Sequence, residues 1–266
     1  MTPPFAAPLW LIGCGTMGGA MLRRWVDAGG DPALVTVVTR SGATVPPGVR
    51  SVTAVPIDAE PATIMLAVKP QQLDVVAPML EHVETPLLVS ILAGVEEAAL
   101  AARFRTGAIV RAMPNLPVAI GKGVTALHTA SQNPMVRAAA TALATPLGLV
   151  EWIDDAAQFD AVTALAGCGP GFTFRFVDAL AAAGVSLGLG ADQARRLAVA
   201  TVEGSGAMAA RSDVSPAVLA DRVASPGGST REGLNVLDAD GALVGLLTRT
   251  LAASARRHAE MAAAAR

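Results

Sequence analysis

Short apolar runs alternate with helix-like segments through roughly the first 150 residues of the chain. Runs rich in Val, Ile and Leu that end at turn residues are typical of strands, and the unbroken apolar run 63–68 is typical of a strand covered on both faces. This alternation predicts a parallel sheet with helices packed against it. The strands expected are 8–12, 35–38, 63–68, 87–91, 108–112 and 148–152.

Strand-like runs stop near residue 153, and long segments rich in Ala and Leu follow. Their spacing predicts a second region made only of helices. Small residues at Gly184, Gly188 and 181–183 leave helix faces that another helix can approach closely. The boundaries expected are an α/β domain over 1–153 and a helical domain over 154–266. The helices expected in it are 156–166, 172–189, 191–211, 215–223, 230–237 and 240–264.

The first expected strand runs into Gly13-Cys14-Gly15-Thr16-Met17-Gly18 and then into a helical run, 19–28. A Gly-x-Gly-x-x-Gly turn between a strand and a helix is typical of dinucleotide binding. Gly13 permits the tight turn, Gly15 lets the backbone approach a pyrophosphate, and Gly18 lets the helix pack closely on the strand. We expect this turn, including Thr16 and Met17, to bind the cofactor.

The residues after the second expected strand indicate which dinucleotide is bound. An NAD enzyme usually carries Asp or Glu there to hold the ribose 2′-hydroxyl. This chain has Thr39-Arg40-Ser41, with one guanidinium, two hydroxyls and no carboxylate to repel a 2′-phosphate. The pattern favours NADP(H), although a solvated arginine after a strand is also common.

Further cofactor contacts are expected where other strands end, because ligands of such sheets bind outside the carboxyl ends of the strands. Lys69 could equally be an ordinary charged loop residue. The positions expected to line the cleft are Val68, Lys69, Pro70, Ala93, Met113, Pro114 and Asn115.

A second glycine-rich segment, Ser225-Pro226-Gly227-Gly228-Ser229-Thr230, precedes an expected helix. The N-terminus of a helix offers free backbone N–H groups to an anion, so this loop suits a carboxylate. Ser229 and Glu232 have the spacing of a capping box, which marks a helix start without implying any function. Asp213 is a secondary candidate for a place near this loop.

Composition limits the class of partner. The 266 residues carry a formal net charge of −2, so neither a nucleic-acid nor a membrane partner is expected. Apolar residues make up 52% of the chain but aromatic residues only 3%, which suits close helix packing and burial in an oligomer. The first 22 residues lack charge but hold several Pro and Gly, so they predict a strand and turn rather than a leader. A cytoplasmic location is therefore expected.

Few residues are candidates for acid–base or metal chemistry. Cys14 and Cys168 lack metal-ligand spacing, and no metal is expected. His82, His128 and His258 lie in segments where a surface or packing role is the simpler interpretation. The chain therefore suits a reaction that a cofactor and well-placed polar groups can carry.

Taken together, these motifs resemble the pyrroline-5-carboxylate reductase family over nearly the whole chain. The resemblance implies a Rossmann-type domain followed by a helical dimerisation domain, and NADPH-dependent reduction of 1-pyrroline-5-carboxylate to L-proline. It also implies that Ser225, Gly227, Gly228 and Ser229 hold the substrate carboxylate while Thr230, as the catalytic residue, reaches the ring nitrogen. The segments that carry it are 12–18, 67–71, 90–94, 111–115, 167–170 and 224–230.

The resemblance also implies a homodimer, or a larger assembly of dimers, that binds a small cyclic imine. Departures from the family pattern are Cys168, Gly171 and Phe172, where Ser, Ala and Tyr are common. Three alternatives stay open: an imine reductase for another ring, a β-hydroxyacid dehydrogenase and a non-catalytic NADP-binding protein. The dehydrogenase would need a lysine in 167–189, and this stretch has none.

Overall fold

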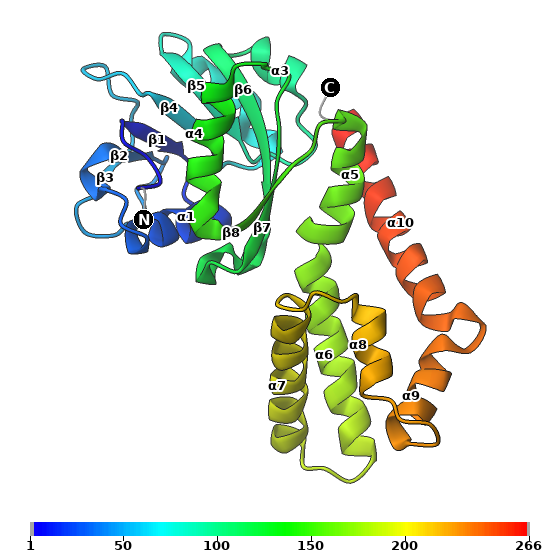
Figure 1. The fold of residues 1–266 in the computed structure, drawn as a ribbon. Helices are drawn as coiled ribbons and strands as arrows, with labels where there is room; N and C mark the ends of the chain where they lie inside the picture. Colours follow the sequence, from blue (N-terminus) through cyan, green and yellow to red (C-terminus); the bar gives the residue numbers. More distant parts are fainter. Residues whose placement is uncertain (1–2, 265–266) are drawn as a thin grey trace. The chain divides into compact units, whose positions relative to one another are not determined.

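The computed structural model describes residues 3–264, and its contacts divide them between two compact units (Figure 1). Unit 1 holds the chain up to Cys168 and again from Ser254 onward, and unit 2 holds the stretch between them. The segment after the last strand stays with unit 1 because Phe159 is buried against Ala126 and Ile153. The division by contacts therefore falls later than residue 153, where strand-like sequence ends.

Unit 1 is built on one eight-stranded sheet with the order β3-β2-β1-β4-β5-β6-β7-β8. The direction of strand addition reverses between β1 and β4, the topological switch point at which such sheets bind ligands. The predicted α/β class with a C-terminal helical region is confirmed. The strands are β1 Leu9–Ile12, β2 Val35–Val38, β3 Arg50–Val52, β4 Thr63–Leu66, β5 Glu84–Ser90, β6 Arg105–Pro114, β7 Gly123–His128 and β8 Gly148–Trp152.

One pair of neighbouring strands departs from the expected parallel arrangement. Strand β7 runs antiparallel to β6, whereas the other paired strands are parallel. The connection between them is only 115–122, and a parallel crossover needs about a dozen residues or more. The sheet is therefore parallel-dominated, as expected, with one antiparallel pair.

Helices cover both faces of the sheet, and strand β1 shows why its sequence is apolar throughout. Leu9 and Leu11 point into one buried cluster, and Trp10 and Ile12 point into the other. The first cluster includes α1 and α4, the second α2 and α3, and α4 crosses one face of the sheet in Figure 1. These helices are α1 Thr16–Asp27, α2 Leu73–Val76, α3 Glu97–Ala101 and α4 Pro134–Ala144.

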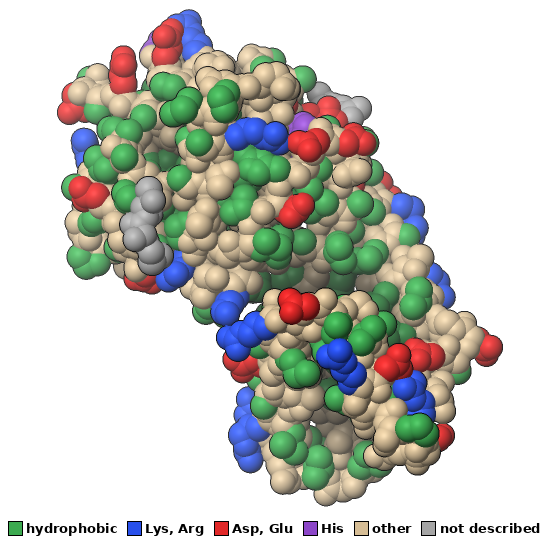
Figure 2. All heavy atoms as spheres, viewed as in Figure 1, with side chains coloured by type: hydrophobic (Ala, Val, Ile, Leu, Met, Phe, Trp, Pro, Cys, Tyr) green, Lys and Arg blue, Asp and Glu red, His purple; other side chains and the backbone are tan. Residues whose placement is uncertain are grey.

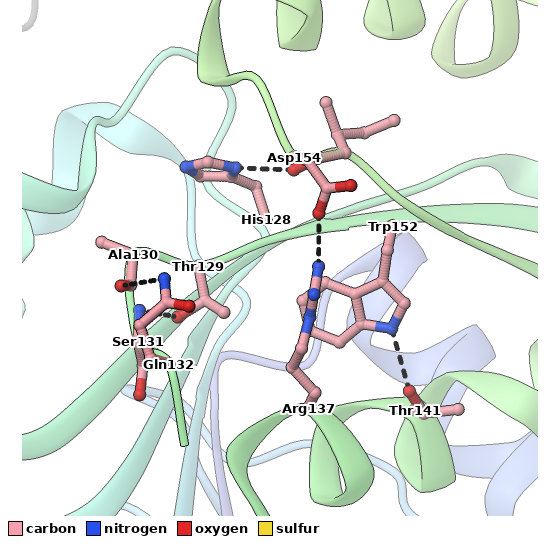
Figure 3. Close-up of polar contacts among 10 residues, drawn as sticks. His128, Thr129, Ala130, Ser131, Gln132, Arg137, Thr141, Trp152 and Asp154 are labelled. Atoms are coloured by element: carbon pink, nitrogen blue, oxygen red, sulfur yellow. Dashed lines mark hydrogen bonds and ion pairs between the residues drawn. The ribbon is translucent and has the colours of Figure 1, made fainter. Parts of the chain in front are cut away.

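Polar contacts tie α4 to the end of β8, as Figure 3 shows. The guanidinium of Arg137 lies 4.4 Å from the centre of the Trp152 ring and donates to Asp154 Oδ1 at 2.7 Å. The indole N–H of Trp152 donates to the Thr141 hydroxyl at 3.0 Å. Trp152 is one of three tryptophans in the chain, and Trp10 and Trp25 are buried in the same unit.

Unit 2 is a group of helices that begins with the hairpin of α6 and α7. A methyl group on Gly184 would lie 3.3 Å from Leu189 and 3.4 Å from Ala194 of the same chain. The small residue therefore serves packing within the hairpin. The helices are α6 Gly169–Ser186, α7 Ala191–Ala209, α8 Pro216–Arg222, α9 Ser229–Asp238 and the part of α10 Ala242–Ala264 up to residue 253.

Unit 2 buries few apolar side chains. Its buried hydrophobic residues within the described chain are three alanines, Ala194, Ala198 and Ala224. Large apolar side chains lie at the surface instead, where Figure 2 colours them green. Examples on four different helices are Phe174, Leu197, Val236 and Val244. These helices present apolar faces that the single chain does not cover.

Candidate active site

The glycine turn after β1 has a shape that only glycine can give it at its first position. Gly13 has φ +90°, and its N–H donates to the carbonyl oxygen of Val38 at 2.9 Å. A Cβ at Gly13 would stand 2.7 Å from both the carbonyl oxygen of Ala67 and Cγ1 of Val68. The turn is thus pressed against the end of β4.

The other two glycines differ in their surroundings. A Cβ at Gly18 would lie 3.0 Å from the carbonyl oxygen of Gly13, so this position sets how closely α1 packs on the turn. A Cβ at Gly15 would meet no protein atom within 4 Å. Gly15 is the N-cap of α1 and offers no side-chain cap, which leaves the amides of Thr16 and Met17 available to an anion.

A cavity of about 700 Å³ lies beside this turn, along the carboxyl ends of the central strands. Two of the predicted cofactor residues do not line it: Gly18 is buried under the turn, and the side chain of Asn115 is held inside the protein. The predicted residues that the structure brings together there are Gly13, Gly15, Thr16, Met17, Thr39, Arg40, Ser41, Val68, Lys69, Pro70, Ala93, Met113 and Pro114.

The charge around this cavity is positive. Arg40 and Lys69 line it, and none of the described lining residues is acidic. Arg40 is exposed at the end of β2, beside Thr39, whose hydroxyl oxygen is buried with no partner among the described residues. A dinucleotide that carries a 2′-phosphate fits this end of the cavity, because it supplies negative charge and hydroxyl groups.

Sequence reasoning missed the apolar wall of the cavity. Val75 and Met79 are large, exposed and four residues apart, and both line the cavity with Val76. Apolar residues at helical spacing just after Lys69-Pro70 would have been the signal. Such a wall suits a flat aromatic base.

Cys14 lies in the turn and lines the cavity. Burial raises the pKa of its thiol, and the nearby Arg23 only partly opposes this. The thiol therefore stays protonated near neutral pH, which argues against a nucleophilic role.

In unit 2, the second glycine loop forms a tight turn into α9. Gly227 has φ +69°, and the N–H of Gly228 donates to the carbonyl oxygen of Ser225 at 2.9 Å. Gly228 is the N-cap, without a side-chain cap, and Ser229 is already helical. The expected capping box of Ser229 and Glu232 was therefore wrong, because the turn starts the helix one residue earlier.

This arrangement leaves the first-turn amides of α9 available to an anion. Thr230 lies in that turn and is exposed. Arg231 donates to Asp221 Oδ1 at 2.7 Å and so fixes the loop to α8. Asp213 is exposed in the segment before α8, and the structure describes no bond between it and the loop in residues 3–264.

The histidines lie away from the nucleotide cavity. His82 is exposed, and His128 Nδ1 lies 2.7 Å from the carbonyl oxygen of Ile153 (Figure 3). His258 is buried, and its Nδ1 lies 2.7 Å from Asp160 Oδ1. Each histidine thus has a surface or packing position.

Arg111 is a buried arginine that lies near Asp160, the partner of His258. The guanidinium of Arg111 stacks 4.2 Å from the centre of the Phe159 ring. Burial lowers the pKa of Arg111, and the carboxylates of Glu96, Asp160 and Glu97 oppose that shift. These contacts hold α5, Phe159–Val162, against β6.

No group of three or more His, Cys, Asp or Glu side chains in residues 3–264 could hold a metal ion. Within the same residues, no helix is both long enough and apolar enough to cross a bilayer.

Comparison with known proteins gives two matching family profiles. Residues 156–261 match a profile described as pyrroline-5-carboxylate reductase dimerisation, and residues 9–94 match one described as NADP oxidoreductase, coenzyme F420-dependent. The first match covers most of the helical region, and the second covers the glycine turn and most of the residues that line the cavity.

Individual relatives agree with these profiles. The chain is 38% identical over 211 residues to pyrroline-5-carboxylate reductase of Pseudomonas aeruginosa, which covers 77% of this chain and 76% of that protein. A structure of the Coxiella burnetii enzyme matches with a TM-score of 0.86 and 29% identity, over 96% of this chain and 98% of that one. The Plasmodium falciparum pyrroline carboxylate reductase, solved with NADP bound, matches with a TM-score of 0.81 and 25% identity over the same shares. The resemblance carried by the motifs is confirmed, and the chain belongs to the pyrroline-5-carboxylate reductase family.

Proposed function

We propose that this protein reduces 1-pyrroline-5-carboxylate to L-proline with NADPH as the reductant. The observation that carries the proposal is the pair of uncapped helix starts, at Gly15 in unit 1 and at Gly228 in unit 2. Each offers backbone N–H groups to an anion, and the proposed reaction brings two anionic molecules, a dinucleotide and a carboxylate.

NADPH is the cofactor that the cavity of unit 1 fits. The amides of Thr16 and Met17 would hold its pyrophosphate, and Arg40 with Thr39 and Ser41 would hold its 2′-phosphate. Gly13 and Gly18 shape the turn, and Val68, Lys69, Pro70 and Ala93 line the cavity beyond it. When bound, NADPH supplies the hydride.

Reduction of this substrate requires little acid–base catalysis by the protein. A protonated cyclic imine is already an electrophile, and hydride addition at its ring carbon gives a neutral amine with no further proton to remove. The residues need only hold the ring and stabilise charge. This agrees with the position of all three histidines outside the cavity.

The loop 225–230 would do this holding. The first-turn amides of α9, next to Ser225, Gly227, Gly228 and Ser229, would bind the substrate carboxylate. Thr230 would place its hydroxyl at the ring nitrogen and stabilise the proton there. Arg231, tied to Asp221, would keep the loop in position. Asp213, in the segment before α8, is a secondary candidate for a contact with the substrate near this loop.

We further propose that the protein works as a homodimer through unit 2. The support is that unit 2 buries only alanines among its described apolar residues while Phe174, Leu197 and Val244 are exposed. Burial of such side chains contributes about 1.5–3 kcal/mol each, which a second copy would supply. We propose 1–153 and 154–266 as the functional domains. We also propose a cytoplasmic location, in which the two cysteines stay free.

The test is an assay of purified protein with NADPH and pyrroline-5-carboxylate, followed by nicotinamide absorbance, with proline identified by mass spectrometry. 1-Pyrroline, which lacks the carboxylate, is the matched control and should react far more slowly. Equal rates on the two rings would remove the role of the α9 loop. No proline under any condition would refute the proposed activity. Light scattering at assay concentration tests the dimer, and an active monomer would refute it.

A further inference from the structure

Asn115 follows strand β6 and is 7% exposed, with all of its polar groups engaged inside unit 1. Its side-chain Nδ2 donates to the carbonyl oxygen of Ala166 at 2.9 Å, and its Oδ1 accepts from the N–H of Val124 at 2.8 Å. Its backbone N–H donates to the carbonyl oxygen of Val124 at 3.1 Å. Both polar atoms of the side chain thus have a protein partner, and the residue does not line the cavity.

The bond to Ala166 replaces a hydrogen bond that the following helix cannot form. In an unbroken α-helix, the carbonyl of residue 166 would accept from the N–H of residue 170, but residue 170 is proline and has none. The chain instead forms a π-helical turn over Thr163–Gly167, in which Cys168 N–H donates to the carbonyl oxygen of Thr163 at 2.9 Å. Asn115 supplies the donor that Pro170 lacks.

The π-helical turn Thr163–Gly167 is the last turn before the chain leaves unit 1 at Cys168. The chain returns at Ser254, whose hydroxyl donates to the sulfur of Cys168 at 3.1 Å. The two crossings are therefore tied to each other, and the first is tied by Asn115 to the end of β6. A Cβ at Gly167 would lie 2.5 Å from Met113, which lines the nucleotide cavity.

The end of β6 thus contributes to two features. Met113 lines the cavity, and Asn115, two residues later, binds the turn 163–167 through which the chain leaves unit 1. We infer that Asn115 is a positioning residue for the proposed reduction, acting through the turn 163–167 and not through contact with the dinucleotide. This inference rests on the proposed function. It predicts that loss of the Asn115 donor slows turnover while nucleotide affinity stays the same, because hydride transfer depends on the placement of the two reactants.

The first test is Asn115→Asp, which keeps the shape and the acceptor for Val124 but puts a carboxylate oxygen against the Ala166 carbonyl. At neutral pH, kcat should fall roughly tenfold or more, the scale of one buried carbonyl left without its donor. The Kd for NADPH, from nicotinamide fluorescence, should stay within about twofold. Asn133→Asp is the matched control, since Asn133 uses only its acceptor, toward Met135 N–H at 2.9 Å.

The pH profile separates this role from a merely structural one. Burial beside a carbonyl oxygen raises the pKa of the introduced carboxyl group, and its neutral form can donate to Ala166. The ratio of Asn115→Asp activity to wild-type activity should therefore rise as the pH falls. The same ratio for Asn133→Asp should stay flat. A flat ratio for Asn115→Asp would contradict the inference.

The closing experiment is the double-mutant cycle of Asn115→Asp with Pro170→Ala, which returns an N–H to residue 170. In the Pro170→Ala background, the losses in kcat and in Tm caused by Asn115→Asp should be at most half as large. Equal losses in both backgrounds, or a weakened NADPH Kd with normal kcat, would overturn the role. The Tm cycle and the Kd for NADPH need no imine. An inactive wild type would therefore refute the proposed activity, whereas a lack of coupling in Tm between positions 115 and 170 would refute the role of Asn115.

Discussion

Alanine at Gly13 and alanine at Gly15 should have opposite effects, although the two glycines are neighbours in one turn. At Gly13, an alanine would hold φ near +90° and place its methyl 2.7 Å from the carbonyl oxygen of Ala67. The backbone conformation costs about 1–2 kcal/mol and the overpacking about 1–3 kcal/mol. Together they should lower the stability of unit 1 by roughly 2–5 kcal/mol, or about 5–15 °C in Tm.

At Gly15 the methyl would meet no protein atom within 4 Å. The fold should lose less than about 1 kcal/mol, the difference between glycine and alanine at an N-cap. The methyl would instead stand where the pyrophosphate approaches the amides of Thr16 and Met17. Losing one such charge-assisted bond should weaken NADPH binding about tenfold or more.

Thermal unfolding followed by tryptophan fluorescence measures the first effect, and titration of nicotinamide fluorescence measures the second. Gly13→Ala should unfold earlier than wild type. Gly15→Ala should unfold with the wild type but bind NADPH weakly. A Gly15→Ala protein with normal NADPH affinity would refute the placement of the pyrophosphate, and a fully stable Gly13→Ala protein would refute the strain argument.

Three more predictions follow from the sites. Arg40→Asp should raise the KM for NADPH by roughly 10- to 100-fold, far more than the KM for NADH, and equal effects in steady-state kinetics would remove the 2′-phosphate contact. Thr230→Val should lower kcat/KM for the imine by about 10²–10⁴-fold with NADPH affinity unchanged, and full activity would exclude this hydroxyl. Because burial raises the pKa of Cys14, iodoacetamide should label it slowly at neutral pH, with the rate rising only above the pH at which a free thiol reacts; mass spectrometry of the labelled peptide checks this.

The strands with strong apolar runs were predictable from sequence. β2 and β8 have the predicted bounds, and β1 and β4 begin or end within two residues of them. β3 was missed because its three residues, Arg50–Val52, are largely exposed and show no pattern. A strand ending at His128 was possible from the sequence, but the antiparallel pairing of β7 with β6 follows from the short connection between them and not from its composition.

The candidate site was predictable where glycine spacing alone determines the geometry. The turn 13–18 and the residues after β2 came from that spacing, and the cavity brings most of them together. Asn115 could not be placed in this way, because its partner Ala166 lies far along the chain. The Ala166 carbonyl is available to Asn115 because Pro170 has no N–H to donate to it. The start of α9 differed for a similar reason, since the Ser225–Gly228 turn, rather than the serine, determines where the helix begins.

The position of the tryptophans gives unit 1 a spectroscopic signal of its own. All three lie in unit 1, and the chain has no tyrosine. Indole emission should therefore report on unit 1 alone, whereas far-ultraviolet circular dichroism should be dominated by helices from both units. On dilution, a loss of helical ellipticity at constant indole emission would mark dissociation-linked unfolding of unit 2. Labels or engineered tryptophans would then be needed only in unit 2 to follow its assembly.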